Sequence, residues 1–351
     1  METPTLTPND MRPLAFALFL AFVIGLAVWS YGSRDASREF EAISIGTPGG
    51  TLYETPFWVA EENGYFKAEG LRAALREYES GGAAFRAMLA GDAVDIAAHA
   101  PTPFAAEAFR RDDFALLAAY ATAADSIKMV ADAARGVRSV GDLRGKRIGV
   151  SKNTGGEYFL DLVLSTNALA ASETKLFDTA PAEMPQALER GNVDAIVTWE
   201  PHIAAAKELL GPRAIELGGA EAYREVFLLS TMRRFAEERV ATIEKFLRAL
   251  RRAEGFIKEN PELAREVAIR HLPPDAAAVF RATWQQFGFE LSLDQSLLAI
   301  FSDQGRWLHK KGLTVSCCSA ARTGAEFPSY PELFSSDALR AVKPEAVTII
   351  R

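Results

Sequence analysis

Three pairs of glycines precede segments with helical patterns in this chain of 351 residues. The pairs are Gly49-Gly50, Gly81-Gly82 and Gly155-Gly156. The first N–H groups of a helix have no intrahelical acceptor and carry a partial positive charge, and glycine lets such a backbone approach a ligand closely. The three helix starts are therefore suited to a sulfonate, phosphate or carboxylate group. The alternative is that these glycines serve only the turns.

Acidic side chains beside the glycines favour a ligand that also carries a positive group. Glu54, Glu157 and Glu200 lie at the predicted loops, against one base, Lys152. Like charges repel, so the pattern favours a zwitterion such as taurine, or a pyrimidine with an amino group, over a lone inorganic anion. For Glu157 the alternative is a first-turn residue that the helix dipole stabilises and that points to solvent.

Two aromatic residues and one histidine complete the set of candidate side chains. Tyr53 and Trp199 are expected to stack on or cap a ligand, with simple packing as the alternative. His99 is interpreted as a hydrogen-bonding loop residue, because the sequence offers no general-base partner for it. No catalytic residue, metal ligand or cofactor site is predicted. The predicted substrate-binding residues are Thr51, Tyr53, Glu54, Gly82, His99, Thr102, Asn153, Thr154, Gly155, Glu157, Trp199 and Glu200.

Two stretches of the chain predict the same order of elements, β-α-β-α-β. The first has strands at 43–47, 71–78 and 94–98 and helices at 56–67 and 83–90; the second has strands at 148–150, 174–177 and 193–198 and helices at 157–169 and 182–190. The third strands also match locally, because LAGDAVDIAAHAP at 89–101 corresponds to LERGNVDAIVTWEP at 188–201. We interpret the chain as an internal structural duplication.

This organisation predicts a cleft between two lobes. Short crossover helices give right-handed parallel units, and ligands of open parallel sheets bind outside the carboxyl ends of the strands. Two rims of loops are then expected to face each other, one made of 47–55, 79–82 and 99–103 and the other of 151–156, 178–181 and 199–201.

The rest of the chain is expected to pack back on the first lobe. It begins with a strand near Val226 and continues in helices, one with Ile243 and Phe246 on its face and another running through Phe280 to Phe287. Two crossings between the lobes follow, near Asp125 and Tyr223. The predicted domains are an N-terminal signal or anchor (1–33), lobe I (42–124 with 224–351) and lobe II (125–223).

The N-terminus predicts an export segment. Residues 14–30, LAFALFLAFVIGLAVWS, carry no charge, and as a helix they would span ~26 Å, close to the ~30 Å hydrocarbon core of a membrane. Trp29 and Tyr31 suit a membrane interface, and no A-x-A-like cleavage site or lipoprotein cysteine follows. We favour an uncleaved transmembrane helix over a cleaved signal, with a buried core helix as the third alternative.

Charge and cysteine content exclude other classes of protein. The net charge is −7, and nucleic-acid binding needs clustered basic residues. The two cysteines, Cys317 and Cys318, are adjacent; their Cα atoms lie closer together than disulfide geometry normally allows. They form no disulfide framework and have no second cysteine or histidine cluster at zinc spacing.

Four motifs in order give the chain a family resemblance. They are the segments 57–71, 91–101, 140–150 (VGDLRGKRIGV) and 187–191 continued by Trp199-Glu200-Pro201. The chain resembles substrate-binding proteins of ABC importers in the nitrate, sulfonate and taurine branch, related to the thiamine-pyrimidine (NMT1/THI5-like) proteins. The resemblance implies an α/β, two-lobe periplasmic-binding-protein fold of type II (Venus flytrap). It also implies a periplasmic monomer without cofactor that hands a small solute to an ABC permease in the inner membrane.

The alternative to a solute-binding protein is an enzyme of the same fold. Thiamine-pyrimidine synthases resemble the chain in their glycine loops but carry a dense cysteine motif in the second lobe, which is missing here. An export segment also fits poorly with a cytosolic synthase. The sequence therefore favours capture of an alkanesulfonate-like or taurine-like solute, with a thiamine-pyrimidine precursor binder or synthase as the alternative.

Overall fold

A computed structural model describes residues 40–218, 223–312 and 327–349. Residues 42–351 form one compact unit. The predicted N-terminal transmembrane helix and the Cys317-Cys318 pair lie outside the described residues. Within the described ranges, no helix combines the length and the apolar character that crossing a membrane requires.

One of the two sheets has six strands in the order β11-β4-β10-β3-β1-β2. Strands β1 and β3 are parallel, with Ile45 opposite Ile96, whereas β10 runs antiparallel to both of its neighbours. The strands are β1 (Glu41–Pro48), β2 (Leu71–Tyr78), β3 (Ile96–His99), β4 (Phe114–Ala124), β10 (Arg224–Met232) and β11 (Phe287–Ser292).

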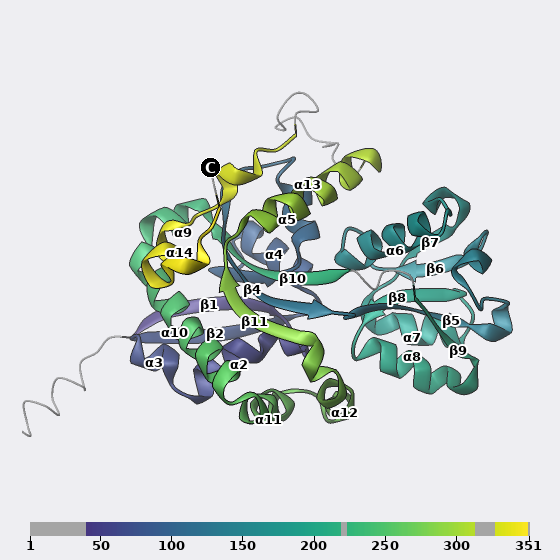
Figure 1. The fold of residues 1–351 in the computed structure, drawn as a ribbon, viewed down its shortest axis with the longest axis horizontal. Helices are drawn as coiled ribbons and strands as arrows, with labels where there is room; N and C mark the ends of the chain where they lie inside the picture. The colour runs from purple at the N-terminus through teal and green to yellow at the C-terminus, as the bar shows by residue number, and fades with distance from the viewer. Residues whose placement is uncertain (1–39, 219–222, 313–326, 350–351) are drawn as a thin grey trace, which may run out of the picture. The chain divides into compact units, whose positions relative to one another are not determined.

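The other sheet has five strands in the order β7-β6-β8-β5-β9 and lies beside the first in Figure 1. Strand β6 is parallel to β7 and β8, and β5 is antiparallel to β8 and β9. The strands are β5 (Ile127–Asp132), β6 (Arg147–Val150), β7 (Lys175–Asp178), β8 (Ala195–Trp199) and β9 (Ala214–Leu217).

The repeated β-α-β-α-β order predicted from the sequence is confirmed. The neighbours β2-β1-β3 in one sheet correspond to β7-β6-β8 in the other. The connecting helices are α2 (Thr55–Glu62), α3 (Tyr65–Ala68) and α4 (Gly81–Ala90) in the first unit, and α6 (Gly155–Thr166) and α7 (Met184–Glu189) in the second. The single helix predicted at 56–67 is wrong, because Gly64 adopts a φ of +66° and separates α2 from α3.

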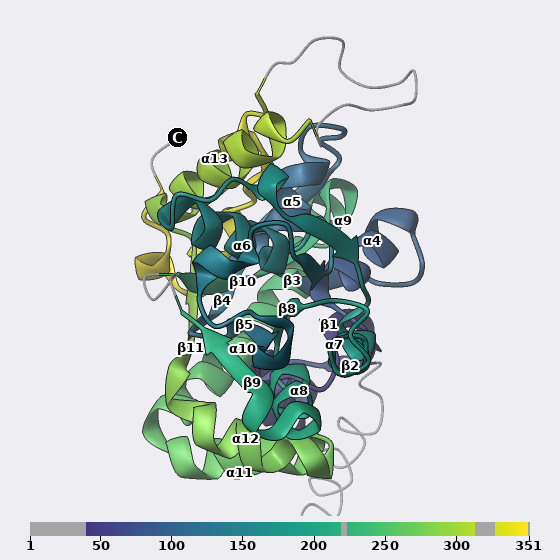
Figure 2. The same ribbon diagram turned by 90° about the vertical axis from the view of Figure 1, so that its right-hand side faces the viewer.

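Each sheet has its own hydrophobic core. Helix α6 covers one face of the five-stranded sheet, where Leu160 and Val163 pack with Ile148. Helices α7 and α8 (His202–Leu210) cover the other face, as Figures 1 and 2 show. The core of the six-stranded sheet is larger and includes the C-terminal helices.

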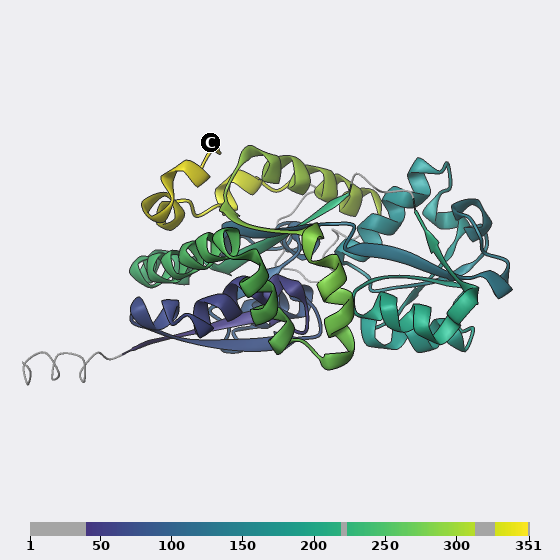
Figure 3. The same ribbon diagram turned by 60° about the horizontal axis from the view of Figure 1, so that its bottom comes forward.

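The C-terminal helices pack against the six-stranded sheet, as the periodicity predicts. Phe246 of α10 is fully buried and its ring stacks on those of Phe57 and Phe66; Figure 3 shows α10 in green beside the purple helices of the first unit. The helices outside the two repeats are α5 (Pro101–Glu107), α9 (Arg233–Glu238), α10 (Val240–Glu259), α11 (Pro261–His271), α12 (Pro274–Thr283), α13 (Gln295–Lys310) and α14 (Asp337–Val342).

Strand β11 differs from the sequence prediction. The apolar pattern through Phe280 and Phe287 predicts one helix, but α12 ends at Thr283 and Phe287 begins an edge strand paired with β4. The chain passes between the sheets after Ala124 and again before Arg224. The domain limits drawn from the sequence remain a prediction of how the chain divides into moving bodies.

Candidate functional site

A cavity lies where the carboxyl ends of the parallel strands of both sheets meet. The space inside it, open mouth included, is about 480 Å³. Residues from both predicted rims line it, and six of them belong to the predicted binding set: Thr51, Tyr53, Gly82, Thr154, Gly155 and Trp199.

Helix α4 begins at the wall of this cavity. Ser80 caps it, because its Oγ accepts a hydrogen bond from the N–H of Ala83 at 3.2 Å. A Cβ added to Gly81 would lie 2.7 Å from the Cα of His99 and 2.9 Å from the carbonyl oxygen of Ala98. Only glycine therefore lets this first turn lie against β3. Within the described chain, the N–H groups of Gly81 and Gly82 have no protein acceptor.

Helix α6 begins at the same cavity from the other sheet. Its N-cap is Thr154, whose Oγ1 accepts from the N–H of Gly156 at 3.2 Å and donates to the carbonyl of Ser151 at 2.6 Å. A Cβ on Gly155 would lie 3.1 Å from Oε1 of Glu225. The first turn of α6 thus lies against a carboxylate that reaches the cavity from β10.

The third predicted helix start lies within one residue of its predicted place, because α2 begins at Thr55 and the sequence predicts Pro56. The 3-10 turn Leu52–Glu54 separates it from the pair Gly49-Gly50, so these two glycines do not themselves begin a helix. The N–H of Gly50 donates to Oε2 of Glu54 at 2.9 Å, and Oγ1 of Thr47 donates to Oε1 at 2.6 Å. The fully buried Glu54 holds the loop before Thr51 instead of lining the cavity. Burial raises the pKa of Glu54 to about 7.

Tyr53 and Glu225 form a buried polar pair at the cavity. The hydroxyl of Tyr53 donates to Oε2 of Glu225 at 2.7 Å, and Oγ of Ser126 donates to the same oxygen at 3.0 Å. The ring of Tyr53 stacks on that of Phe227, with centroids 3.6 Å apart. Burial raises the pKa of the Glu225 carboxyl above its usual value.

Trp199 lines this cavity and a second one beside it. The second cavity is also lined by Thr51, Tyr53, Lys128 and Glu200. Oε2 of Glu200 accepts the N–H of Ala204 in the first turn of α8 at 3.0 Å, and burial raises its pKa. The predicted residue Glu200 therefore lies near Trp199, in the neighbouring cavity.

Comparison with known families identifies the chain. The profile of the family described as "NMT1/THI5 like" matches residues 51–264, more than half of the sequence. The chain belongs to the NMT1/THI5-like family. The match covers both helix starts and all of the cavity-lining residues named above.

The relatives of this NMT1/THI5-like protein include binding proteins. One from Bacillus subtilis, named for the binding of aliphatic sulfonates, is 27% identical over 241 residues, which are 67% of this chain and 71% of that protein. Among solved structures, the alkanesulfonate-binding protein SsuA from Xanthomonas axonopodis pv. citri bound to MOPS matches with a TM-score of 0.66 and 18% identity, over 79% of this chain and 96% of the other.

An enzyme shares the same fold. The desulfurization enzyme DSZB matches with a TM-score of 0.60 and 15% identity, over 87% of this chain and 99% of the other. Sequence identities of 15–18% to these solved structures show a shared fold and nothing about a shared activity. The chain therefore has the α/β periplasmic-binding-protein fold with two sheets.

Several predicted residues of this NMT1/THI5-like chain do not line the first cavity. Oγ1 of Thr102 donates to Oε1 of Gln304 at 2.8 Å, and the N–H of Asn153 donates to Oε2 of Glu157 at 2.7 Å. His99 is fully buried, and burial lowers its pKa to about 4. Its Nδ1 donates to the carbonyl of Ala100, so Nε2 accepts from Oγ of Ser230, both at 2.8 Å. The side chains of Thr102, Glu157 and His99 therefore bond to other parts of the protein.

Sequence reasoning missed Glu225, Phe227 and Ser126. They lie beside the two passages of the chain between the sheets, where no glycine pair or aromatic motif marks a site. The predicted crossings near Asp125 and Tyr223 could have pointed to these three residues. A chain segment that passes from one lobe to the other also passes the cleft between the lobes.

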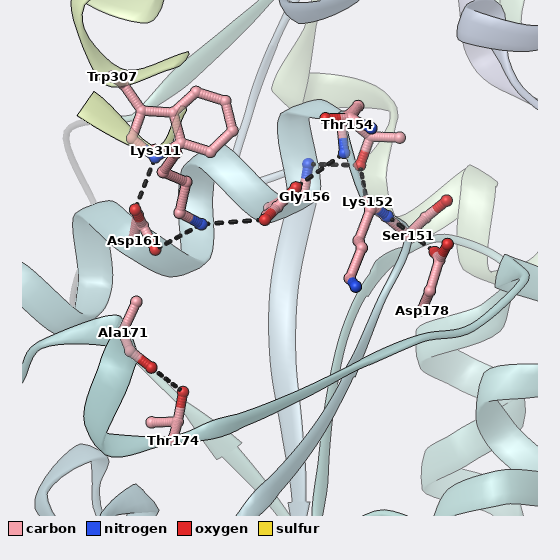
Figure 4. A network of polar contacts seen from close by, with 12 residues as sticks. Ser151, Lys152, Thr154, Gly156, Asp161, Ala171, Thr174, Asp178, Trp307 and Lys311 are labelled. Carbon is pink, nitrogen blue, oxygen red and sulfur yellow. Dashed lines mark hydrogen bonds and ion pairs between the residues drawn. The ribbon is translucent and has the colours of Figure 1, made fainter. Parts of the chain in front are cut away.

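A polar network joins α6 to α13 (Figure 4). Nζ of Lys311, directly after α13, lies 2.9 Å from Oε1 of Glu157 and 3.2 Å from Oδ1 of Asp161. Nε1 of Trp307 donates to Oδ2 of Asp161 at 2.6 Å. Helix α13 packs in the core of the six-stranded sheet through Phe301, whereas α6 covers the five-stranded sheet. The α6–α13 network therefore ties the two cores together beside the Asn153 loop.

Replacing Glu54 with Gln should remove a pH dependence of stability. Between its ordinary pKa of 4.5 and the folded value of about 7, the folded chain binds the proton more tightly than the unfolded chain. Wild-type stability relative to Glu54→Gln should therefore fall as pH rises through this window, by about 2–3 kcal/mol between pH 5 and 8. Urea unfolding at both pH values measures it, with Glu61→Gln on the exposed face of α2 as the control. A wild-type to Glu54→Gln difference that is independent of pH would contradict the assignment.

Replacing Lys311 with Met should destabilise the folded chain. The change leaves Glu157, whose side chain is 6% exposed, without this cation, and we expect a loss of about 2 kcal/mol in the free energy of unfolding because a buried charge then lacks its partner. Lys310→Met, at the exposed neighbouring lysine, is the control and should change stability by less than about 0.5 kcal/mol. Equal unfolding free energies for the two variants would show that the network is not stabilising.

Proposed function

We propose that this chain is the solute-binding component of an ABC importer and that it captures a small organic anion or zwitterion of the sulfonate class. The observation that carries the proposal is the pair of helix starts, Gly81-Gly82 and Gly155-Gly156, that meet at one cavity. Unpaired N–H groups at a helix N-terminus are suited to the oxygens of a sulfonate or carboxylate. The names of the relatives in the aliphatic-sulfonate group point to the same class.

Capture without chemistry fits the lining of the cavity. Hydroxyl groups of Thr51, Tyr53, Ser80 and Thr154 lie there, but no histidine or cysteine is among the described residues that line it. A hydroxyl nucleophile needs an adjacent general base. His99 is buried with both ring nitrogens occupied, and the hydroxyl that lies beside a carboxylate, that of Tyr53 next to Glu225, belongs to a ring stacked on Phe227. The likeness to DSZB concerns the fold, so we do not propose catalysis.

Closure on the solute is expected to use the two passages between the sheets. Trp199 and Thr154 come from the five-stranded side and Thr51 and Gly82 from the six-stranded side, so a rotation of one side against the other would open or close the cavity. We propose a monomer that delivers the solute to an ABC permease in the inner membrane.

We also propose a periplasmic location, with the chain held at the inner membrane by residues 14–30. The proposal follows from the uncharged N-terminal segment and from the periplasmic binding proteins of the same fold. Mass spectrometry of the chain from a membrane fraction should find the N-terminal segment still attached. A mature N-terminus near residue 33 would instead show a cleaved signal.

Ligand binding should raise the melting temperature of the purified chain. A ligand at 100 times its dissociation constant adds about 2.7 kcal/mol to the free energy of unfolding, which is a shift of several degrees. The panel includes alkanesulfonates, taurine, nitrate, short carboxylates and aminopyrimidines. We expect sulfonates to give the largest shifts; an absence of any shift from sulfonates at millimolar levels would contradict the proposed class.

Trp199→Ala tests whether the cavity is the place of binding. Trp199 is part-exposed at the end of β8 and lines the cavity, so its loss should weaken sulfonate binding by about 10-fold or more, the contribution of a large aromatic contact. The melting temperature without ligand should change little. Unchanged affinity by calorimetry would remove Trp199 from the site.

A further inference from the structure

The two repeats build the loop before their first helix in the same way. In the first repeat Gly50 has a φ of +71° and donates its N–H to Oε2 of Glu54 at 2.9 Å. In the second repeat Asn153 has a φ of +58° and donates its N–H to Oε2 of Glu157 at 2.7 Å. A positive φ is strained for a residue with a side chain and persists only where its surroundings hold it. The bond to Glu157 therefore helps to hold the turn at Asn153.

A threonine next to this turn brings each loop to the cavity. Oγ1 of Thr51 and Oγ1 of Thr154 each donate to the carbonyl oxygen three residues earlier, at 2.9 Å and 2.6 Å. Both threonines line the cavity. We call the segments 48–54 and 151–157 the first and second glutamate loops. They are equivalent parts of the duplication, and in each of them a glutamate holds the turn beside a cavity-lining threonine.

The two glutamate loops differ in the origin of the second partner of the glutamate. Oε1 of Glu54 accepts from Oγ1 of Thr47 at 2.6 Å, and Thr47 belongs to β1 in the same sheet. Oε1 of Glu157 instead lies 2.9 Å from Nζ of Lys311. Lys311 directly follows α13, which packs in the core of the six-stranded sheet, whereas Glu157 lies in α6 on the five-stranded sheet. The second glutamate loop is thus completed from the opposite side of the molecule.

Lys311 is held in place for this contact (Figure 4). Its Nζ lies 3.2 Å from Oδ1 of Asp161 and 5.1 Å from the centre of the Trp307 ring, and Nε1 of Trp307 donates to Asp161. The side chains of Lys311 and Glu157 are only 19% and 6% exposed. Separating so little exposed a pair leaves an uncompensated charge, which is costly. A rotation that parts the two sides would carry that cost.

We propose that Lys311 is a latch between the two sides: it completes the second glutamate loop when they are closed, and so it couples closure to the order of the Thr154 turn that meets the solute. Lys311 is a positioning residue, because it acts on the cavity through Glu157 and does not belong to the described residues that line it. This inference rests on the proposed closure on a solute and names the group that responds to it.

Hydrogen exchange of the full chain, read by mass spectrometry, tests the latch without any solute. In Lys311→Met, peptides that contain the amide of Asn153 should exchange about 10-fold faster than in the wild type, the usual order of coupling between two sites, because the second glutamate loop opens locally. Peptides that contain the amide of Gly50 should keep their wild-type rate, since Glu54 is held from within its own sheet. Unchanged exchange at Asn153, or an equal increase at Gly50, would overturn the inference.

Two further variants separate the charge of the latch from its packing. Lys311→Gln removes the charge and keeps a polar side chain; it should accelerate exchange at Asn153 as Lys311→Met does, and it serves in place of that variant if Lys311→Met folds poorly. Lys310→Met, at the exposed neighbouring lysine, is the control and should leave both glutamate loops unchanged. Wild-type exchange in Lys311→Gln would overturn the role of the charge.

Stopped-flow fluorescence with 1-propanesulfonate, a member of the proposed class, tests the effect on the solute. Lys311→Met should raise the dissociation rate about 10-fold and change the association rate by less than about 3-fold, because the ion pair forms after the solute has entered. A dissociation rate equal to that of the wild type would overturn the latch. If 1-propanesulfonate binds to neither chain, the proposed solute class fails, and the exchange measurement decides the latch on its own.

Discussion

The close approach of two helix starts to the ends of two sheets is the constraint on which the site depends. At Gly81 the backbone of α4 lies so near β3 that a methyl group would collide with main-chain atoms. At Gly155 the start of α6 leaves just enough room for the carboxylate of Glu225. These contacts bring unpaired N–H groups and one acid to a single cavity without any basic side chain among its described lining residues.

Side chains that do not line the cavity hold its parts in place. Glu54 fixes the loop before Thr51 through two hydrogen bonds, at the cost of a buried carboxyl whose pKa rises to about 7. His99 joins β3 to β10 as a neutral ring. The α6–α13 network connects the cores of the two sheets through Lys311. The binding surface thus depends on polar contacts between residues that are far apart in the sequence.

Periodicity and turn residues predicted the repeated units and the glycine starts of α4 and α6, because these are local properties of the chain. Long-range contacts were not predictable in this way. The acidic residues near the glycines suggested a charged ligand, yet Glu54 and Glu157 are held by backbone and lysine partners, and the acid that reaches the cavity is Glu225. Its position depends on the return of β10 between β3 and β4. The apolar pattern through Phe287 is likewise compatible with a helix or with an edge strand. The segment is a strand because it pairs with β4, a contact that the local sequence does not reveal.

Amide NMR spectra recorded during a titration with taurine test the central claim most directly. Glycine amides are well resolved, and those of Gly81 and Gly82 should shift as their N–H groups gain sulfonate oxygens as acceptors. Gly255 in α10, which has no neighbouring atom within 4 Å of its would-be Cβ, should stay unchanged. Shifts that spare Gly81 and Gly82 while taurine binds would contradict the account, because the ligand would then sit away from the helix start.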